Sequence, residues 1–351
     1  MKYTDYILVG QGIAGSLLAW YLIKNKKTVI LIDSKNESSA SLVAAGIIHP
    51  ITGRRIVKTW MADELLPFAN DAYREIEIQF EEKILHPLGI VELLSNPKEY
   101  NDWMARSGEK ELSGYIDNSD SIATYAKYLQ PFYKSITVNR ASWVNTGTLL
   151  RTLRNYFLQQ QILIEEKFKI DSLSKTENGV MYHDISASGV IFCEGIEAME
   201  NPYWWHLPFL PSKGEVLTIR AEMNLDHILN RKIFIQPLGM NLFRVGSTYS
   251  WDQIDNLPSE AGKEFLISQL RSILKIPFEV VDHKAAIRPT VKDRRPFLGL
   301  HPKHDQIGIF NGLGTKGCLL APYFAHHFAG YLSGKNELMQ EVNVRKLNPK
   351  S

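Results

Sequence analysis

The chain has 351 residues, of which 44% are hydrophobic and 22% are charged, and this composition predicts a globular protein long enough for two domains. The net charge of +2 gives no reason to expect nucleic-acid binding, although a local basic patch stays open. Cys193 and Cys318 are too few for a disulfide framework and lack metal-ligand spacing, so we expect two buried thiols and no metal site.

The N-terminal segment MKYTDYILVG leads almost directly into the first apolar run. It has no basic stretch followed by an apolar core and a cleavage site, so we expect no signal peptide. No segment approaches the roughly 20 apolar residues of a membrane span. The expectation is a cytoplasmic protein.

The first predicted elements are a strand, a glycine turn, a helix and a second strand. Tyr6–Val9 is a short apolar run that fits a buried strand. Residues 16–26 carry apolar residues at helical spacing and lysines at the far end, where positive charge suits the helix dipole. Residues 28–32 (TVILI) form a second β-branched run that ends at Asp33.

Three glycines between this strand and helix predict a dinucleotide site. Gly10 makes a tight turn, Gly12 lets a pyrophosphate approach the backbone, and Gly15 lets the helix pack close to the strand. Asp33 follows Gly10 by 23 residues, near the spacing at which an acid binds a ribose and disfavours the 2′-phosphate of NADP. NAD and FAD both carry ADP, so this unit alone does not separate them.

The middle of the chain continues with alternating elements. Residues 39–60 combine small residues with a basic run, and residues 61–82 have the pattern of an amphipathic helix. A further helix begins near residue 145, capped by Asn145 or Thr146. Residues 162–173 (ILIEEKFKIDSL) read as strands, and residues 189–195 (GVIFCEG) as an apolar strand that ends in glycine.

The second half of the chain predicts an antiparallel sheet. The strands are EVLTIR (215–220), KIFIQPL (232–238) and NLFRVGSTY (241–249), and a helix follows over residues 259–275. The C-terminal region then repeats the order strand, glycine turn and helix around residues 312–317. Free backbone N–H groups and the positive end of a helix there would face an electron-rich group.

A glycine turn at each end of the chain favours FAD over NAD. One ligand that contacts both turns must be long and must end in a group that accumulates negative charge. FAD satisfies both conditions, because its ADP fits the first unit and the N1–C2=O edge of its flavin fits the second. NAD accounts only for the first unit.

These elements predict an α/β fold: a Rossmann-like FAD-binding domain together with a discontinuous α+β substrate domain that contains an antiparallel sheet. We expect residues 1–82, 141–200 and 285–351 to form the FAD-binding domain. Residues 83–140 and 201–284 are expected to form the substrate-binding domain.

Five blocks in a fixed order resemble a known family. They are GQGIAG with Asp33, SLVAAGIIHP, VIFCEG followed by LPSKGE, AIRPTVKDRRPFLG, and NGLGTKGCLLAP. In these blocks the chain resembles the D-amino-acid-oxidase superfamily of flavoproteins, which includes glycine oxidase, sarcosine oxidase and DadA-type dehydrogenases. It also resembles the oxidase domain of the bifunctional enzyme that modifies the tRNA wobble uridine, without the methyltransferase half of that enzyme.

The resemblance implies which residues contact FAD. The glycines of the first turn would hold the pyrophosphate, Asp33 the adenosine ribose, and a strand backbone at Ile170 the adenine. The implied set is Gly10, Gly12, Ile13, Ala14, Gly15, Asp33, Ser34, Ser41, Ala45, Gly46, Ile47, Ile170, Cys193, Gly195, Arg288, Leu313, Gly314, Thr315, Lys316 and Gly317. Some relatives link a cysteine covalently to the flavin in the block around Arg288; this block has none, so we expect noncovalent FAD.

Three residues are candidates for substrate contact. In relatives with an arginine in the block of Arg288, that arginine pairs with the substrate carboxylate, and the planar fork of a guanidinium suits this role. The alternative for Arg288 is a structural salt bridge. His49 and Tyr249 are further candidates, with packing as the alternative for His49. Lys316 would stabilise a reduced flavin or be a solvated lysine.

The resemblance implies oxidation of the C–N bond of a small amine or amino acid, including N-substituted glycines, by hydride transfer to flavin N5. Oxygen or a carrier would accept the electrons. One alternative is processing of the tRNA wobble uridine, for which the runs GRRIVK (53–58) and KDRR (292–295) would offer a small phosphate patch; tRNA is not favoured. A flavin-binding protein without turnover and an NAD-dependent dehydrogenase also stay open.

Overall fold

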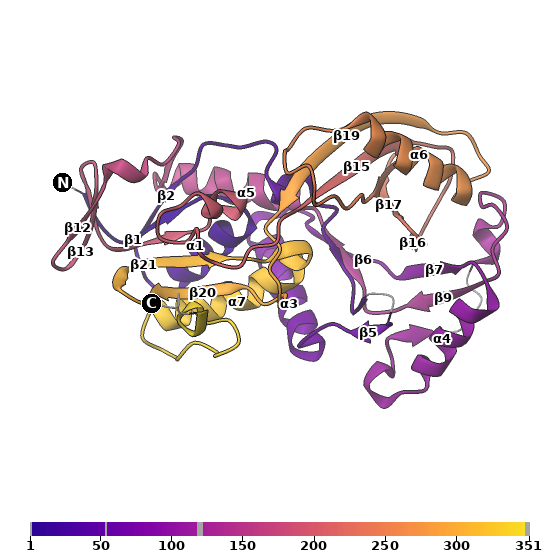
Figure 1. Ribbon diagram of the computed structural model, residues 1–351, viewed down its shortest axis with the longest axis horizontal. Helices are drawn as coiled ribbons and strands as arrows, with labels where there is room; N and C mark the ends of the chain where they lie inside the picture. Colours follow the sequence, from indigo (N-terminus) through magenta and orange to yellow (C-terminus); the bar gives the residue numbers. More distant parts are fainter. Residues whose placement is uncertain (1, 53–54, 118–121, 348–351) are drawn as a thin grey trace.

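Two large sheets lie at opposite ends of an elongated molecule (Figure 1). The computed structural model describes residues 2–52, 55–117 and 122–347. The fold is a mixed α/β arrangement, as expected from the sequence. Among the helices of these ranges, none has the length and apolar character that a bilayer span requires.

The first sheet is built around β1 (Lys2–Val9) and β14 (Ile185–Phe192). Its order is β11 (Leu163–Ile164), β2 (Val29–Ile32), β1, β14, β13 (Gly179–Tyr182) and β12 (Leu173–Thr176); β14 also pairs with β21 (His304–Asn311), which pairs with β20 (Phe297–His301). β1 runs parallel to β2 and β14, and β14 runs parallel to β21. Ile7 and Leu8 are both fully buried, because each face of this sheet is covered.

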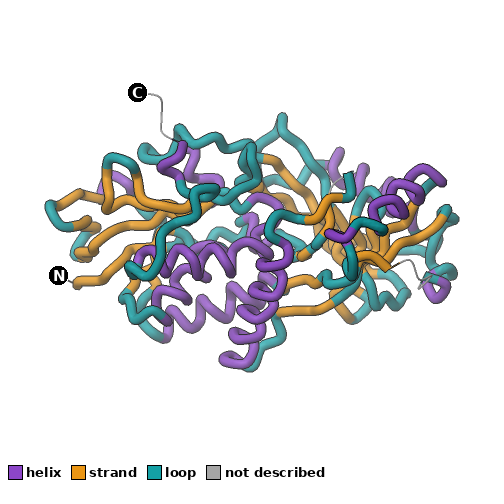
Figure 2. Tube along the Cα trace, turned by 90° about the horizontal axis from the view of Figure 1, so that it is seen from below, coloured by secondary structure: helices purple, strands orange, loops and turns teal. Residues whose placement is uncertain are grey.

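Three helices, α1 (Ile13–Lys24), α5 (Thr146–Gln159) and α7 (Gly317–Leu332), cover one face of the first sheet, and α3 (Ala62–Phe80) packs against α7. Figure 2 shows the helices side by side. Leu17, Tyr73 and Phe324 of these helices share one apolar core with Leu8 of β1. On the other face, Ile7 packs in a second core with Trp204. Asn145 caps α5, since its Oδ1 accepts the Thr148 N–H at 3.0 Å.

The second sheet is antiparallel except for one parallel pair, β16 with β7. Its order is β19 (Glu279–Arg288), β15 (Ser212–Arg220), β18 (Leu242–Gly246), β17 (Phe234–Gly239), β16 (Ile228–Asn230), β7 (Ile90–Leu94), β9 (Lys134–Val138) and β8 (Ile116–Asp117). The three strands expected over residues 215–249 are therefore β15, β17 and β18, and the helix expected at 259–275 is α6 (Glu260–Ile273).

The alternation of side chains along β15 separates a packed face from a cavity face. Leu217 lies under Leu266 and Leu270 of α6, within the core of this sheet. Val216 lies on the opposite face and packs against Val43 of the short helix α2 (Ala40–Val43). The second face therefore looks toward the first half of the molecule.

Smaller elements complete the described chain. β3 (Ile47–Ile48), β10 (Ser142–Val144) and β6 (Leu85–Pro87) form a three-stranded sheet, and β4 (Ile51–Thr52) pairs with β5 (Val57–Lys58). α4 (Pro97–Ser107) packs against β7 and β9.

The structure corrects the strands expected over residues 162–173. Within this range Leu163 and Ile164 form a strand, which stops because its partner β2 ends at Ile32, opposite Ile164, and Leu173 begins β12. The chain beyond has no neighbouring strand to pair with, and residues 170–172 form a 3₁₀ turn before β12. Ile170 is consequently not on a strand.

Candidate functional site

A cavity of about 470 Å³ runs from the end of β1 to the second sheet. This volume falls in the range of small-molecule and cofactor sites, which is roughly 300–1,000 Å³. Its wall combines segments from both ends of the chain with residues of the second sheet. Most of the residues implied for FAD lie on it: Gly10, Gly12, Ile13, Ala14, Asp33, Ser34, Ser41, Ala45, Gly46, Ile47, Cys193, Gly195, Arg288, Leu313, Gly314, Thr315, Lys316 and Gly317.

The N-terminus of α1 opens onto this cavity through the first glycine turn. Gly10 has φ of +95°, a conformation that favours glycine, and Gly12 is the N-cap residue without a side chain. The first N–H groups of α1 therefore face the cavity with the positive end of the helix dipole. Ser41 Oγ accepts one of them, from Ile13, at 3.1 Å. This cradle fits a pyrophosphate.

Gly15 is not on the cavity wall, although the resemblance grouped it with the contact residues. A Cβ at this position would lie 1.9 Å from the carbonyl oxygen of Gly10. Its contribution is the close approach of α1 to the strand, as expected from the sequence.

Asp33 ends β2 and is held in place by three donors. Its Oδ1 accepts the Gln11 N–H at 2.8 Å, and its Oδ2 accepts the Lys35 N–H and one N–H of Arg154, each at 2.8 Å. Arg154 also pairs with Glu165 at 2.7 Å. Sequence reasoning missed Arg154, although a charged residue inside the apolar stripe of α5 was a signal for a buried partner.

The structure also corrects the residue expected at the adenine. The cavity wall near Asp33 is formed by Glu166, Lys167 and Phe168, and Ile170 is not part of it. Ile170 and Phe168 instead pack against the core on the second face of the first sheet. Residues 166–168 are therefore the part of this segment that lies on the cavity wall.

Glu194 is a second residue that sequence reasoning missed. It lies on the cavity wall between Cys193 and Gly195, and its Oε2 accepts the Asn201 Nδ2–H at 2.9 Å. Burial, opposed by the hydrogen bond from Asn201 and aided by the nearby Glu197, raises the pKa of Glu194 to about 7. The sequence carried a signal for this residue, because Glu194 stands directly before Gly195, the VIFCEG glycine that the resemblance implied as an FAD contact.

Both cysteines lie on the cavity wall as buried thiols. Burial raises the pKa of Cys193 strongly and that of Cys318 to about 12. Neither thiol is ionised near neutral pH, so neither is a ready nucleophile.

The C-terminal glycine turn lines the other end of the cavity and carries Lys316. Its Nζ donates hydrogen bonds to Thr52 Oγ1 at 3.0 Å and Thr59 Oγ1 at 2.6 Å. Burial lowers the pKa of Lys316 to about 8, and the neighbouring Arg294 and Arg295 lower it too. Lys316 is therefore held in place and is not a freely solvated lysine.

Arg288 ends β19 on the cavity wall, and its guanidinium lies over the ring of Tyr249 at 4.5 Å. Its other neighbours are the carbonyl oxygens of Lys213 and Thr248, each at 3.4 Å. No acidic side chain of the described chain forms an ion pair with it, and burial lowers its pKa. The structural salt bridge expected as the alternative is not what the structure shows. A Cβ at Gly214 would lie 1.8 Å from Arg288 Nη2, so a side chain at position 214 would clash with the guanidinium.

His49 lies on the cavity wall with both ring nitrogens engaged. Nδ1 accepts the Ile51 N–H at 3.2 Å, and Nε2 contacts Glu92 Oε1 at 3.2 Å. The Nε2 proton therefore points at Glu92, which Asn230 also contacts from its Nδ2 at 2.9 Å. His49 has no free nitrogen for a substrate.

The two basic runs give little support for a phosphate patch. Gly53 and Arg54 lie outside the described residues. In the second run, the guanidinium of Arg295 lies 3.8 Å from the centre of the Trp60 ring, so it serves as a packing partner.

The chain is similar to known proteins over most of its length. The DAO family, described as FAD dependent oxidoreductase, matches residues 5–331. Glycine oxidase from Bacillus subtilis is 25% identical over 357 residues, which cover 92% of this chain and 90% of that protein. The bifunctional protein of tRNA 5-methylaminomethyl-2-thiouridine biosynthesis from Marinobacter nauticus is 22% identical, and the match covers 92% of this chain but 54% of that protein.

Solved structures show the same fold. Glycine oxidase from Geobacillus kaustophilus has a TM-score of 0.82 at 19% identity, covering 96% of each chain. L-α-Glycerophosphate oxidase from Mycoplasma pneumoniae, a structure with FAD bound, has a TM-score of 0.73 at 15% identity, covering 98% of each chain. The predicted fold class and the FAD requirement are confirmed. The chain belongs to the DAO family of FAD-dependent oxidoreductases.

Proposed function

We propose that this enzyme oxidises the C–N bond of an amino acid or an N-substituted glycine. The observation that carries the proposal is Arg288, a half-buried guanidinium on the cavity wall that no acidic side chain of the described residues neutralises. A partly desolvated cation of this kind favours an anionic partner. A substrate carboxylate supplies that partner in a bidentate pair.

The cavity residues fit FAD in a defined direction. The turn at Gly10–Gly12 and the start of α1 would hold the pyrophosphate, Asp33 the ribose, and residues 313–317 the pyrimidine of the flavin. When bound, FAD supplies the two-electron oxidation by accepting a hydride at N5. The neutral thiols of Cys193 and Cys318 support noncovalent binding.

The chain's own residues position the substrate and control charge. Arg288 fixes the carboxylate, so the adjacent carbon and nitrogen are oriented in the cavity. Tyr249 covers the guanidinium and keeps it partly out of water. Lys316, held by Thr52 and Thr59, places a positive charge at the end of the cavity where the flavin would accumulate negative charge. Both ring nitrogens of His49 are engaged by Ile51 and Glu92, so we assign His49 no proton transfer with the substrate amine.

A second candidate is oxidation of a carboxymethylamino group on the tRNA wobble uridine. The bifunctional relative supports it, and the same arginine would bind the carboxylate. The packing of Arg295 on Trp60 removes one cation from the surface such a substrate would need. A flavin-binding protein without turnover is opposed by the lack of an internal carboxylate at Arg288 in the described chain.

An absorption spectrum followed by anaerobic titration tests the proposal. The panel contains D-amino acids, glycine, sarcosine and N-carboxymethyl amines. We expect a flavin spectrum that one class of these compounds bleaches, and admission of air or of an artificial carrier then tells oxidase from dehydrogenase. A flavin that none of them bleaches overturns the proposal and brings the tRNA substrate forward.

A further inference from the structure

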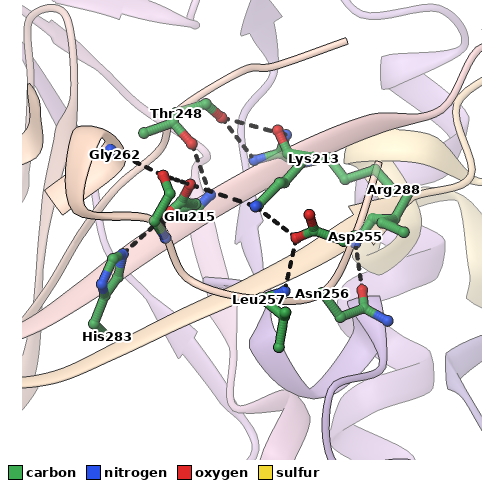
Figure 3. Close-up of polar contacts among 11 residues, drawn as sticks. Lys213, Glu215, Thr248, Asp255, Asn256, Leu257, Gly262, His283 and Arg288 are labelled. Carbon is green, nitrogen blue, oxygen red and sulfur yellow. Dashed lines mark hydrogen bonds and ion pairs between the residues drawn. The ribbon is translucent and has the colours of Figure 1, made fainter. Parts of the chain in front are cut away.

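The loop of residues 247–258, between β18 and α6, lies beside Arg288 and supplies Tyr249 and Asn256 to the cavity wall (Figure 3). Its large apolar side chains are mostly exposed, with Trp251 at 65% and Leu257 at 71%. Burial of apolar surface therefore contributes little to the position of this loop. Polar contacts must hold it instead.

Lys213 of β15 contacts this loop through both its backbone and its side chain. Its backbone pairs with Ser250 in both directions, at 2.9 and 3.1 Å, and its Nζ forms an ion pair with Asp255 Oδ1 at 2.7 Å. Lys213 is only 2% exposed, so its ammonium group requires a counter-ion. The other nearby acid, Glu215, lies 3.9 Å away.

Glu215 is engaged elsewhere, at the start of α6. Its carboxylate accepts the Ser259 N–H at 2.9 Å and the Ser259 hydroxyl at 2.7 Å, and His283 Nε2 lies 2.8 Å from it. A Cβ at Gly262 would lie 2.5 Å from the same carboxylate. Glu215 therefore fixes the end of the loop, and Asp255 is the partner left for Lys213.

Asn256, the residue after Asp255, is oriented by a hydrogen bond to the edge strand of the second sheet. β19 is the edge strand of the second sheet, and its residue Ile287 donates its backbone N–H to Asn256 Oδ1 at 3.1 Å. This bond fixes the side-chain amide next to Arg288. Within the described residues, the Nδ2 group of Asn256 has no acceptor, and the residue lies on the cavity wall. A donor without an acceptor at this place suits an anionic ligand.

We propose that Asn256 binds the substrate carboxylate alongside Arg288, and that the Lys213–Asp255 ion pair is a positioning contact that keeps Asn256 there. The inference rests on the proposed function, since it takes a carboxylate as the ligand. Arg288 supplies charge and a planar fork, and Asn256 adds a neutral donor from a different segment. A carboxylate is then recognised only when the loop is in place.

The test compares four variants of the FAD-loaded protein: three preserve side-chain size, and the fourth, Asp255→Glu, keeps an acidic counter-ion for Lys213. Asn256→Asp replaces the donor with a carboxylate that competes for Arg288, Asp255→Asn removes the counter-ion of Lys213, and Asp252→Asn is the matched control. Asp252 lies on the same loop, is exposed, and forms no ion pair among the described residues. Acetate and benzoate are titrated by the change in flavin absorption, and chymotrypsin probes the loop at Trp251 and Leu257.

We expect Asn256→Asp to raise the Kd for acetate at least tenfold. The hydrogen bond from the Asn256 amide to the acetate carboxylate would be replaced by repulsion between two carboxylates. Asp255→Asn should raise it about threefold to tenfold and speed cleavage of the loop, and Asp255→Glu should restore protection. Asp252→Asn should match the wild type in both measurements.

Wild-type affinity in FAD-loaded Asn256→Asp would overturn the role of Asn256. Equal cleavage of Asp255→Asn and Asp252→Asn would overturn the role of the ion pair. If the wild type binds neither carboxylate and no amine bleaches it, the proposed function itself fails, and this outcome differs from the other two.

Discussion

Arg288 combines partial burial with a charge that no acidic side chain of the described residues neutralises. Its guanidinium faces two carbonyl oxygens and an aromatic ring, which stabilise the cation without neutralising it. Gly214 leaves the space beneath it. A side chain prepared in this way needs little reorganisation when an anion arrives.

Replacing Arg288 with lysine should weaken substrate binding far more than turnover. Lysine keeps the charge but cannot form a bidentate pair, so we expect KM for a carboxylate substrate to rise roughly 10- to 100-fold. Steady-state kinetics on the substrate found by bleaching measures this. Arg220→Lys, at the exposed far end of β15, is the control and should be unchanged. An unchanged KM in Arg288→Lys would contradict the assignment.

Glu194 predicts a pH-dependent stability of the FAD-free protein. An unfolded glutamate ionises near pH 4.3, whereas burial raises the pKa of Glu194 to about 7 in the folded chain. Between these values the unfolded state has lost the proton and the folded state keeps it, so the free energy of unfolding falls as pH rises. Above pH 7 this contribution is constant.

The variant Glu194→Gln should remove this dependence, because it keeps an oxygen for Asn201 and cannot ionise. We expect it to be more stable than the wild type at pH 8 and to lose most of that advantage at pH 4.5. Urea unfolding at the two pH values measures both. The same difference at both pH values would show that Glu194 does not titrate in this window.

At the scale of elements, the unit of β1, glycine turn and α1 was predictable because its signals are local. The apolar run, the spacing of the glycines and Asp33 all lie within the first 33 residues. The loop that carries Lys316 was harder to interpret, because its partner Thr59 lies 257 residues away in the chain. Sequence periodicity carries no information on such a pair.

A methyl group at Gly15 should disturb this element. In Gly15→Ala the new Cβ would lie 1.9 Å from the Gly10 carbonyl oxygen, so α1 must move away from the turn. We expect a loss of about 1–3 kcal/mol in stability, together with weaker FAD binding. Thermal melting and the ratio of FAD to protein after purification report these effects.

Gly147→Ala is the matched control in helix α5. There the nearest atom would be 3.6 Å away, and alanine should raise stability by roughly 0.5–1 kcal/mol. If Gly15→Ala behaves like Gly147→Ala, the close packing of α1 on the turn is not important for the site.

The errors of the sequence analysis arise where an element depends on a distant neighbour. The resemblance placed Ile170 on a strand, yet β2 ends too early to pair with it. The contact of Arg154 with Asp33 and the anchoring of the 247–258 loop by Lys213 likewise join separate segments. The fold class and the place of Arg288 and of most implied FAD residues on the cavity wall were predictable, because the family motifs carry that information.

At the scale of the whole molecule, the cavity joins the two halves of the structure around one ligand. Its wall takes residues from the first turn, from the second sheet and from the C-terminal turn. FAD should therefore stabilise the entire chain. Any ligand that binds only the folded state adds about 2.7 kcal/mol when present at a hundred times its Kd.

The melting temperature of the FAD-free protein should rise with FAD concentration. FMN, which carries the flavin without the ADP half, leaves the first glycine turn unfilled and should produce a much smaller shift. Differential scanning fluorimetry with both compounds measures this. Equal shifts from FAD and FMN would contradict the assignment of Gly10–Gly12 and the start of α1 to the pyrophosphate.

The placement of the two glycine turns also sets the order of events during synthesis. β1 emerges from the ribosome early, yet β14, which pairs with it, and β21, which pairs with β14, are made much later. At about 5–20 residues per second, roughly 15–60 s separate the first turn from the last. A chain that stops before Gly312 has the pyrophosphate cradle but lacks the segment that closes the other end. We therefore expect complete binding of FAD only after the C-terminal glycine turn has been synthesised.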